Sequence, residues 1–241
     1  MNLFEKKEYV EGQLERVPIR VIENFDELFA LSYTNNSVTI EGHDIDYEDV
    51  VRVINNEEVD CDETLKKSIV NHYHTFKKVK ESAQNKVDLT EELFKDFHEM
   101  LMKDIINGGL YRNVDIHIQG SKHTPTSHLR VYQKMDDLFY EIEHFKGDPI
   151  ELAAYTHLRI AKVHPFLDGN GRIARMMLNY QLIRHGFLPI SIPVERRKTY
   201  FQLLETYKVK HDQEPFNQFL RELVEAEYDR LVLVIRLATM N

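Results

Sequence analysis

The chain has 241 residues, which suits one domain or one domain with a small appendage. Of these residues 42% are hydrophobic and 29% charged, the proportions of an ordinary globular protein. Its net charge of −9 argues against broad binding to nucleic acid, because an acidic surface repels the phosphate backbone. The single cysteine, Cys61, excludes an intrachain disulfide framework. The longest clean apolar run near the C-terminus is too short to span a bilayer, and the charged N-terminus lacks a signal-peptide core, so we expect a cytoplasmic protein.

Apolar residues recur at helical spacing in most of the chain. The spacing predicts helices at about residues 25–33, 37–42, 47–55, 63–82, 90–106, 133–145, 150–163, 172–185, 194–208 and 215–238. Only one stretch alternates like a strand, with Val114, Ile116 and Ile118 separated by polar residues. Gly120 would turn this strand, and the return strand would end at Pro125. We therefore expect an all-α fold with one small exposed β-hairpin.

A composition shift near residue 87 suggests how the chain is organised. We expect an N-terminal helical segment over residues 1–87, packed on a larger helical unit over residues 88–226. Residues 227–241 would then be the end of a C-terminal helix.

The stretch "VHPFLDGNGRIARMMLNYQL", residues 163–182, concentrates charged and polar residues ahead of a helix. His164-Pro165 ends the preceding helix, since proline disfavours helical geometry in the residue before it. The next helix begins near Arg172 and is apolar nearly all round, which is typical of a buried helix. Arg172, Arg175 and Asn179 nevertheless share one narrow stripe of it. Buried arginines need an anionic partner, either a protein carboxylate or a bound phosphate.

The loop before this helix favours phosphate. Gly169-Asn170-Gly171 can adopt positive φ angles that direct backbone N–H groups toward an anion at the helix N-terminus. Arg172 offers a guanidinium fork, and Asp168 would repel a phosphate unless it holds a bridging Mg²⁺. His164 is the nearby group that can transfer a proton near neutral pH. Together these residues predict nucleotide binding with Mg²⁺ and a general base.

Other motifs fit less well. A calcium loop starting at Asp168 is excluded, because Arg172 occupies its third ligand position and Asn179, instead of a glutamate, its twelfth position. The chain has no G-x-x-x-x-G-K-[ST] phosphate loop. Three histidines lie near the predicted hairpin, His117, His123 and His128, and could suggest a zinc site. However, the alternation places His117 on the polar face, and we do not expect zinc to bind here.

The segment "HPFLDGNGRIAR" resembles the pattern H-P-F-x-[DE]-G-N-G-R-x-x-R of Fic-domain proteins without a break. The similarity extends over roughly residues 30–222. Within it, "VDIHIQGSKHTP" resembles the family's flap, and "RKTYFQLLETY" with "PFNQFL" resembles its closing helices. One departure is "HTPT" in the flap, where many relatives have a second proline. The resemblance implies a helical Fic fold and an enzyme that transfers AMP from ATP to a Ser, Thr or Tyr hydroxyl of a target protein.

The resemblance also implies roles for single residues. His164 would be the catalytic base, Asp168 the Mg²⁺ ligand, Arg175 the contact to the γ-phosphate and Phe166 the anchor of the loop. The ATP-binding set would comprise Gly120, Ser121, Lys122, His123, Asp168, Gly169, Asn170, Gly171, Arg172, Ile173, Ala174, Arg175, Tyr200 and Tyr207. The two tyrosines are placed near the adenine, although core packing explains them equally well. Glycine at position 171, where a phosphorylating variant of the family has lysine, favours AMP transfer.

A second motif lies upstream, in "NNSVTIEGH". Ser37 and Glu41 share a helix face, and Gly42 would end that helix, so the stretch alone could be a short capped helix with a solvated glutamate. However, "SVTIEG" resembles the family's inhibitory pattern S/T-x-x-x-E-G/N. This resemblance implies an inhibitory helix at about residues 31–42, with Ser37, Glu41 and Gly42 as its key residues. Glu41 would pair with Arg175 and withhold it from ATP.

Two rival functions remain open at this point. One is removal of AMP from a modified protein, with Glu41 positioning a water molecule. The other is a non-catalytic ATP-binding interaction module, because the helix from Phe216 to Leu237 has enough apolar positions for a partner or a homodimer. We expect ATP and an unknown target protein, which could be the chain itself, as partners. We expect neither nucleic acid nor a membrane.

Overall fold

The computed structural model describes residues 1–118 and 120–239, and this part of the chain contains helices but no strand. The predicted all-α fold is confirmed. The helices are α1 (Leu3–Gln13), α2 (Ile19–Ile40), α3 (Tyr47–Ile54), α4 (Glu63–Gln84), α5 (Glu91–Leu101), α6 (Val131–Glu143), α7 (Pro149–Val163), α8 (Asn170–Arg184), α9 (Arg197–Lys210) and α10 (Glu214–Thr239). Three short 3₁₀ turns cover Leu14–Arg16, His128–Arg130 and Val194–Arg196.

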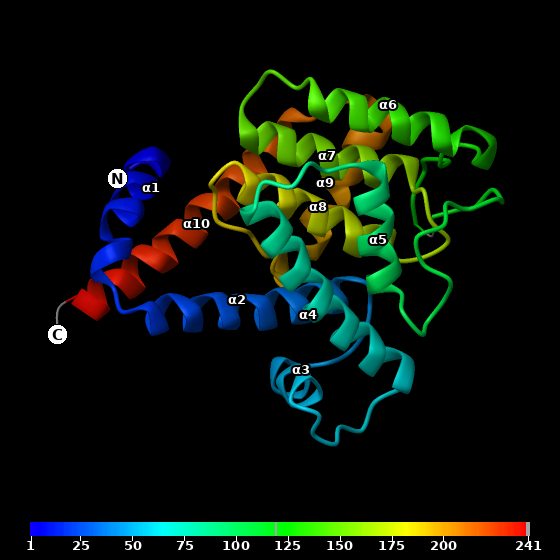
Figure 1. Cartoon of the computed structure of the whole chain (residues 1–241). Coiled ribbons are helices and arrows are strands. Elements are labelled where there is room, and N and C mark those ends of the chain that lie inside the picture. The colour runs from blue at the N-terminus through cyan, green and yellow to red at the C-terminus, as the bar shows by residue number, and fades with distance from the viewer. Residues whose placement is uncertain (119, 240–241) are drawn as a thin grey trace.

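Helix α8 lies at the centre of the fold (Figure 1). Nearly all of its residues are buried, as its apolar circumference predicts. One hydrophobic cluster packs it together with α7, α9 and α10, and a second packs it together with α2, α4, α5 and α6. The N-terminus of α8 is therefore held rigidly from several sides, which is a requirement for any precise ligand site built there.

Helix α2 is one continuous helix of 22 residues, where the sequence pattern suggested two shorter ones. The polar stretch that interrupted the pattern is stabilised by tertiary contacts: Thr34 Oγ1 lies 3.1 Å from a buried histidine ring, Asn35 donates to the Ile45 carbonyl, and Asn36 donates to Ser191. Glu41 is the residue that ends α2, and Gly42 follows with a φ of +107°.

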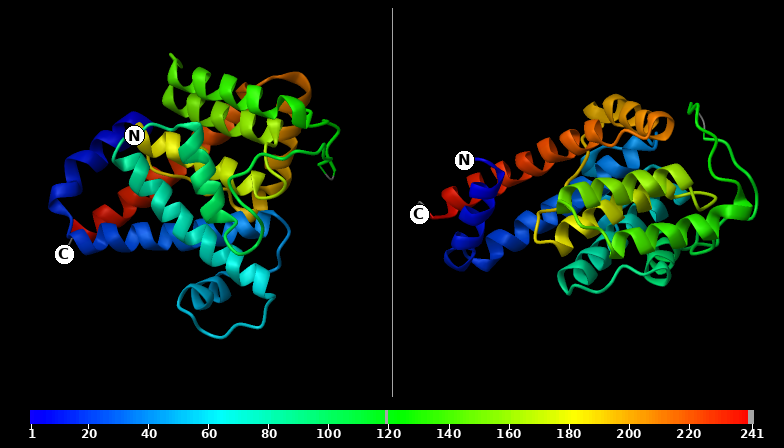
Figure 2. Two further views of the ribbon diagram at one scale, coloured as in Figure 1. Left: turned by 45° about the vertical axis from the view of Figure 1, so that its right-hand side comes forward. Right: turned by 90° about the horizontal axis from the view of Figure 1, so that it is seen from above.

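Helix α1 lies beside the C-terminal half of α10, and both extend to one side of the core together with the start of α2 (Figures 1 and 2). Lys6 of α1 pairs with Glu225 and Asp229 of α10 across this contact. The apolar pattern of α1 was too weak to be predicted. Helix α10 runs without a break through the boundary expected near residue 226, and residues 240–241 of the predicted C-terminal segment lie outside the described residues. The domain boundaries stay a prediction.

The segment between α5 and α6 includes the flap, residues 113–127, which leaves the core as two extended arms (Figure 2). The chain turns at Gly120, whose φ is +77°, and Ser121 N–H donates to the Ile118 carbonyl. The predicted β-hairpin is not observed, because no strand ladder joins the described parts of the two arms. A two-stranded hairpin is marginal by itself, and here other contacts hold the arms.

Among the described residues, no helix combines the length and the apolar character that crossing a bilayer requires.

Candidate active site

A cavity of about 380 Å³ lies where the end of α2, the flap, α7, α8 and α9 meet. It brings together seven of the residues predicted from the sequence: Glu41, Gly120, Ser121, His164, Gly171, Arg175 and Tyr200. Residues that the sequence did not predict as site residues complete its lining: Ile118, Ala161, Arg197, Phe201, Leu204, Glu205 and Lys208.

The loop between α7 and α8 is closed by its own side chains. The Asn170 amide accepts from Phe166 N–H and donates to the Phe166 carbonyl, both at 2.9 Å. Phe166 is fully buried, and its ring stacks on His98 with centroids 3.4 Å apart. His98 Nε2 lies 2.9 Å from the Asp168 carbonyl, which ties the end of the loop to α5. The Asn170 side chain thus serves the loop itself, and only its main chain is directed to a ligand at the helix N-terminus.

The glycines of this loop have two different roles. Gly169 has a φ of +73° and begins α8, whereas Gly171 lies in the first helical turn with an ordinary φ. The N–H groups of Asn170, Gly171 and Arg172 have no carbonyl partner within the helix, so the positive end of α8 is available to an anion.

Two predicted members of the ATP-binding set, Ile173 and Ala174, are fully buried in the core. Ile173 N–H already donates to the Gly169 carbonyl within the helix. These two residues therefore support the site by packing.

His164 is the last residue before the loop and has a left-handed conformation, with a φ of 54°. Burial lowers the pKa of His164 to about 4, and the nearby Lys208 charge adds to this effect. The imidazole is therefore neutral near pH 7 and able to accept a proton. Its Nδ1 atom is buried near the Ala161 carbonyl without a hydrogen bond of good geometry, which leaves Nε2 as the nitrogen for chemistry in the cavity.

Arg175 is only 2% exposed, and its anionic partner is a protein carboxylate. Nη2 lies 2.6 Å from Glu41 Oε1, and the same nitrogen donates to the Ser37 carbonyl at 2.9 Å. Nε donates to Ser37 Oγ at 3.0 Å, and Nη1 donates to Tyr200 at 3.4 Å. Ser37 and Glu41 thus point from one face of α2 toward a single arginine of α8.

The charges of this pair reinforce each other. Burial raises the pKa of Glu41, but the charge of Arg175, its hydrogen bond and the nearby Arg172 charge together outweigh burial, so that the pKa falls below its usual value and the carboxylate stays ionised. For Arg175, burial lowers the pKa, but the charge and hydrogen bond of Glu41 together with the nearby Tyr200 and Tyr33 outweigh burial, and the net shift is upward. The ion pair is therefore fully charged at neutral pH.

Arg172 and Asp168 lie at the N-terminus of α8, outside the cavity lining. Arg172 donates to Ser68 Oγ at 2.5 Å, and its other nitrogen lies 3.4 Å from Asp168 Oδ2. The Asp168 side chain is 62% exposed, and its Oδ1 accepts from Gly169 N–H. The third residue of the predicted stripe, Asn179, bonds twice to the main chain of Ile190 and has a structural role.

The described residues contain no cluster of three or more His, Cys, Asp or Glu side chains that could hold a metal by themselves. Asp168 is a single exposed carboxylate beside a helix N-terminus. That donor set fits Mg²⁺, which is commonly bound by one or two carboxylates together with the phosphates of a nucleotide.

The predicted flap residues are held by protein groups. Glu205 of α9 accepts from Ser121 Oγ at 2.7 Å and from Lys122 N–H at 2.8 Å. His123 Nε2 lies 3.1 Å from the Lys162 carbonyl. No local motif marked Glu205, because its partners are more than 80 residues away in the sequence.

The two predicted adenine neighbours differ in position. Tyr200 lines the cavity, and its hydroxyl lies 3.1 Å from His157 Nε2 as well as near Arg175. Tyr207 is buried outside the cavity, with the Lys162 ammonium 5.6 Å from its ring centroid. Of the two, only Tyr200 is in place to contact a ligand in this cavity.

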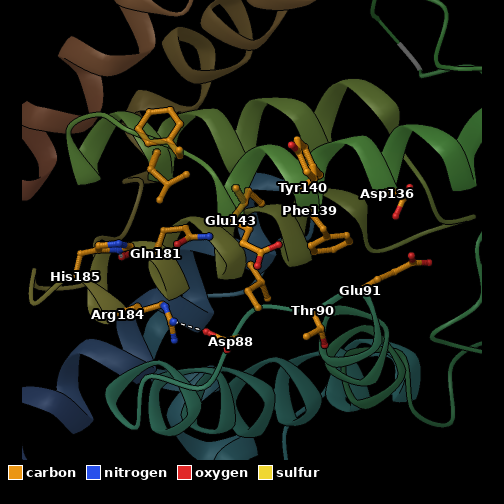
Figure 3. Close-up of a pocket in the computed structure, with 14 residues that line it drawn as sticks. Asp88, Thr90, Glu91, Asp136, Phe139, Tyr140, Glu143, Gln181, Arg184 and His185 are labelled. Atoms are coloured by element: carbon orange, nitrogen blue, oxygen red, sulfur yellow. Dashed lines mark hydrogen bonds and ion pairs between the residues drawn. The ribbon is translucent and has the colours of Figure 1, made fainter.

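A second, larger cavity of about 630 Å³ is lined mainly by residues of α6, of the segment leading into α5 and of the end of α8 (Figure 3). The Asp88–Arg184 ion pair, with a separation of 2.5 Å, is among its lining residues. It contains none of the predicted site residues and shares no lining residue with the smaller cavity. The smaller cavity is therefore the candidate active site.

Comparison with known proteins gives a consistent result. Residues 88–182 match the model of the Fic/DOC family. The protein adenylyltransferase Fic of Drosophila persimilis is 28% identical over 156 residues, which cover 64% of this chain and 30% of that protein. The protein adenylyltransferase fic-1 of Caenorhabditis elegans is 32% identical over 141 residues, which cover 57% of this chain and 27% of that protein. The chain thus spans less than a third of the length of these two curated relatives.

The fold comparison covers more of the chain. The crystal structure of a Fic domain containing signaling protein from Bacteroides thetaiotaomicron superimposes with a TM-score of 0.85 at 23% identity, covering 99% of this chain and 96% of that one. The likeness at this identity concerns the fold, and it includes the helices on both sides of the matched segment. The family model and the relatives agree with the fold, and the chain contains a Fic/DOC domain, matched over residues 88–182.

Proposed function

We propose that the chain is a protein adenylyltransferase, which transfers AMP from ATP to a hydroxyl of a target protein and is held inactive by Glu41. The Glu41–Arg175 ion pair carries this proposal, because it lies in the same cavity as His164. A guanidinium as buried as that of Arg175 needs an anion. Glu41 supplies it in the resting protein, and the γ-phosphate of ATP would supply it in the active one. The names of the relatives, protein adenylyltransferases, agree with this reaction.

The phosphates of ATP are placed at the N-terminus of α8. The free N–H groups of Asn170, Gly171 and Arg172 point along the helix axis there, and the helix dipole favours negative charge. Asp168 would hold Mg²⁺, which supplies compensation for the charge of the phosphates when it is bound. Arg172, now bonded to Ser68 and Asp168, is close enough to exchange these partners for a phosphate.

The transfer step needs a base, a leaving group and charge stabilisation. Neutral His164 accepts the proton of the target hydroxyl at Nε2. The hydroxyl oxygen forms a bond to the α-phosphorus, and the bond from that phosphorus to the bridging oxygen of the β-phosphate breaks, releasing pyrophosphate. The α8 N-terminus and the two arginines stabilise the charge that develops on the leaving group. The imidazolium then returns its proton to water.

In the resting state these reaction steps are blocked at Arg175. With Glu41 against Arg175 and beside Gly171, the carboxylate occupies the side of the cavity where the γ-phosphate would bind. Like charges repel, so ATP would bind in an orientation in which its α-phosphorus lies away from His164.

The same cavity supports a second candidate function, removal of AMP from a modified protein. The observation that favours it is an ionised Glu41 lining the cavity together with His164, where a carboxylate could hold a water molecule for attack on a phosphodiester.

The test compares the unmodified protein with Glu41→Gly, each incubated with Mg²⁺ and ATP labelled at the α- or the γ-phosphate in cell lysate. Label transferred only from the α-position, and several-fold stronger in Glu41→Gly, is the expected result. Asp44→Gly, an exposed acid three residues further on and outside the cavity, is the matched control and should behave as the unmodified protein. His164→Ala in the Glu41→Gly background should abolish labelling.

Other outcomes would redirect the proposal. Label from the γ-position would mean phosphorylation, and equal α-labelling with and without Glu41 would remove the inhibitory role. Absence of any label would favour AMP removal or a binding role, and release of AMP from a modified protein would then decide between them.

A further inference from the structure

Arg112 lies at the base of the flap and is only 2% exposed. Its guanidinium donates almost entirely to main-chain carbonyls. Nη1 donates to Val114 at 2.8 Å and Nη2 to Thr126, so one side chain bridges the two arms of the flap. On its other side, Nε donates to the His164 carbonyl at 2.8 Å, and Nη2 also lies 3.4 Å from the Val163 carbonyl. Arg112 therefore joins the flap to the end of α7.

This bridge takes the place of a β-ladder. No strand pairing joins the described parts of the arms, so the spacing at the base of the flap depends on the distance that one planar guanidinium spans between two carbonyls. The main chain of Arg112 adds a further tie, because its N–H donates to the Pro165 carbonyl at 2.9 Å. The side chain and the backbone of Arg112 thus bind the carbonyls of three consecutive residues, 163–165, and attach the base of the flap to the chain before and after His164.

The ring of His164 is held only weakly by its second nitrogen. A base is normally oriented by a hydrogen bond on that nitrogen, but Nδ1 of His164 is buried near the Ala161 carbonyl and forms no hydrogen bond of good geometry among the described residues. Its backbone is also in the left-handed region, which costs free energy unless the surroundings hold it. Its N–H donates to the Ile160 carbonyl and its carbonyl accepts from Arg112. The ring is therefore oriented through its main chain.

The charge of Arg112 is balanced mainly by carbonyl dipoles. Its nearest carboxylate is Asp115, 3.7 Å away and 64% exposed. Asp115 also pairs with His128, so it keeps a partner and access to water when Arg112 is replaced. Substitution of Arg112 therefore leaves no buried carboxylate unpaired, and the core should still fold.

We infer that Arg112 is a positioning residue, which holds the base of the flap and the main chain of His164 as one unit. A target hydroxyl that enters the cavity beside Gly120 and Ser121, the flap residues that line it, then lies at a fixed distance from the imidazole. The test of this inference by kcat rests on the proposed AMP transfer, whereas its test by hydrogen exchange does not.

The catalytic test uses the Glu41→Gly background, with Arg112→Ala and Arg112→Lys. We expect kcat to fall about tenfold or more in both, because a small misplacement of the base is costly and one ammonium cannot bridge both arms. Binding of a fluorescent ATP analogue should stay nearly unchanged, since Arg112 does not line the cavity. Arg159→Ala is the matched control: Arg159 lies on α7, pairs with Glu141, and should leave kcat nearly unaltered.

Chemical rescue separates positioning from general loss of structure. Guanidinium ion, added well below denaturing concentrations, should restore part of kcat to Arg112→Ala, whereas methylammonium should not. A destabilised fold would not respond to the shape of the added cation. An unchanged kcat in Arg112→Ala, or a loss of ATP affinity equal to the loss of kcat, would overturn the inference.

Hydrogen exchange tests the same unit without relying on activity. In otherwise unmodified protein, Arg112→Ala should speed amide exchange in the flap and at residues 163–166, while α4 exchanges as before. If Glu41→Gly with Arg112 intact transfers no AMP, the proposed function fails and exchange still decides the role of Arg112. Unchanged amide exchange in the flap of Arg112→Ala would refute the positioning role of Arg112.

Discussion

Gly171 and Glu41 face each other so closely that a β-carbon added at Gly171 would lie 2.4 Å from Glu41 Oε1. The same β-carbon would lie 3.1 Å from Arg175 Nη1. Position 171 has ordinary helical geometry, so glycine is required here by space rather than by backbone conformation. The ion pair between α2 and α8 can close only because α8 has no side chain at this point.

The first prediction concerns Gly171→Ala. The added methyl group should displace the Glu41 carboxylate, which is the far end of a flexible side chain, and weaken its bond to Arg175. Alanine is otherwise favourable in a helix by about 1 kcal/mol, so the fold should tolerate it. We expect that Glu41→Gly raises α-label transfer by a smaller factor when position 171 is alanine. A double-mutant cycle measures this, and equal factors in the two backgrounds would contradict it.

Ser37→Ala should release part of the inhibition. The substitution removes the hydrogen bond from Arg175 Nε to Ser37 Oγ but keeps both the Ser37 carbonyl bond and Glu41. A bond of this kind to a charged group contributes about 1.5–3 kcal/mol. Transfer should therefore rise to a value between those of the unmodified protein and Glu41→Gly. Thr39→Ala, on the same helix and without contact to Arg175, should have no effect, and a rise in both would discount the Ser37 contact.

Glu41→Gln should lower the free energy of unfolding and make the melting temperature depend more strongly on bound nucleotide. The variant keeps the shape of the side chain but leaves the buried Arg175 charge without an anion. Breaking a fully buried pair costs about 3–5 kcal/mol, and because the Glu41 side chain is 33% exposed we expect roughly 1–3 kcal/mol. ATP with Mg²⁺ should raise the melting temperature of Glu41→Gln more than that of the unmodified protein. Calorimetry of both proteins measures this, and equal shifts would argue against a phosphate at Arg175.

Features of the fold and of the site could be predicted from the sequence where the residues that form them lie close together in the chain. The stretch from His164 to Arg175 is contiguous, so its chemistry could be inferred before its geometry was known. The same holds for Ser37 and Glu41, which helical spacing places on one face. The periodicity of the helices is also local, and most of them begin and end within a few residues of the predicted bounds.

Features formed by distant residues were not predicted. The continuity of α2 depends on partners such as Ile45 and Ser191, which satisfy its polar residues. The flap alternates like a strand, yet a single arginine replaces the ladder that this pattern suggests. Glu205 and Arg197 are invisible in the sequence because each binds a segment far away in the chain. In physical terms, periodicity reports local geometry, whereas tertiary hydrogen bonds depend on the assembled fold.

The last prediction concerns acid. Burial lowers the pKa of His157 to about 3, that of His98 and His164 to about 4, and that of His72 well below its usual value, whereas histidine in an unfolded chain titrates near about 6.5. A histidine with a depressed pKa stabilises the fold fully above pH ~6.5 and loses this contribution as the pH falls toward its folded value. The free energy of unfolding should therefore drop below pH ~6.5, and each of these histidines adds roughly 1.4 kcal/mol for each unit of pH to the slope.

Urea unfolding between about pH 7.5 and pH 4.5 measures this slope. His157→Gln should reduce this slope by roughly 1.4 kcal/mol for each unit of pH. His164 itself remains neutral to about pH 4, so activity lost between about pH 6 and pH 5 should follow the unfolded fraction and recover when the pH is raised. A protein that stays fully folded while it loses activity in that range would show instead that the base titrates there. Burial keeps His164 neutral and able to accept a proton at neutral pH. The same burial of histidines makes the fold sensitive to acid.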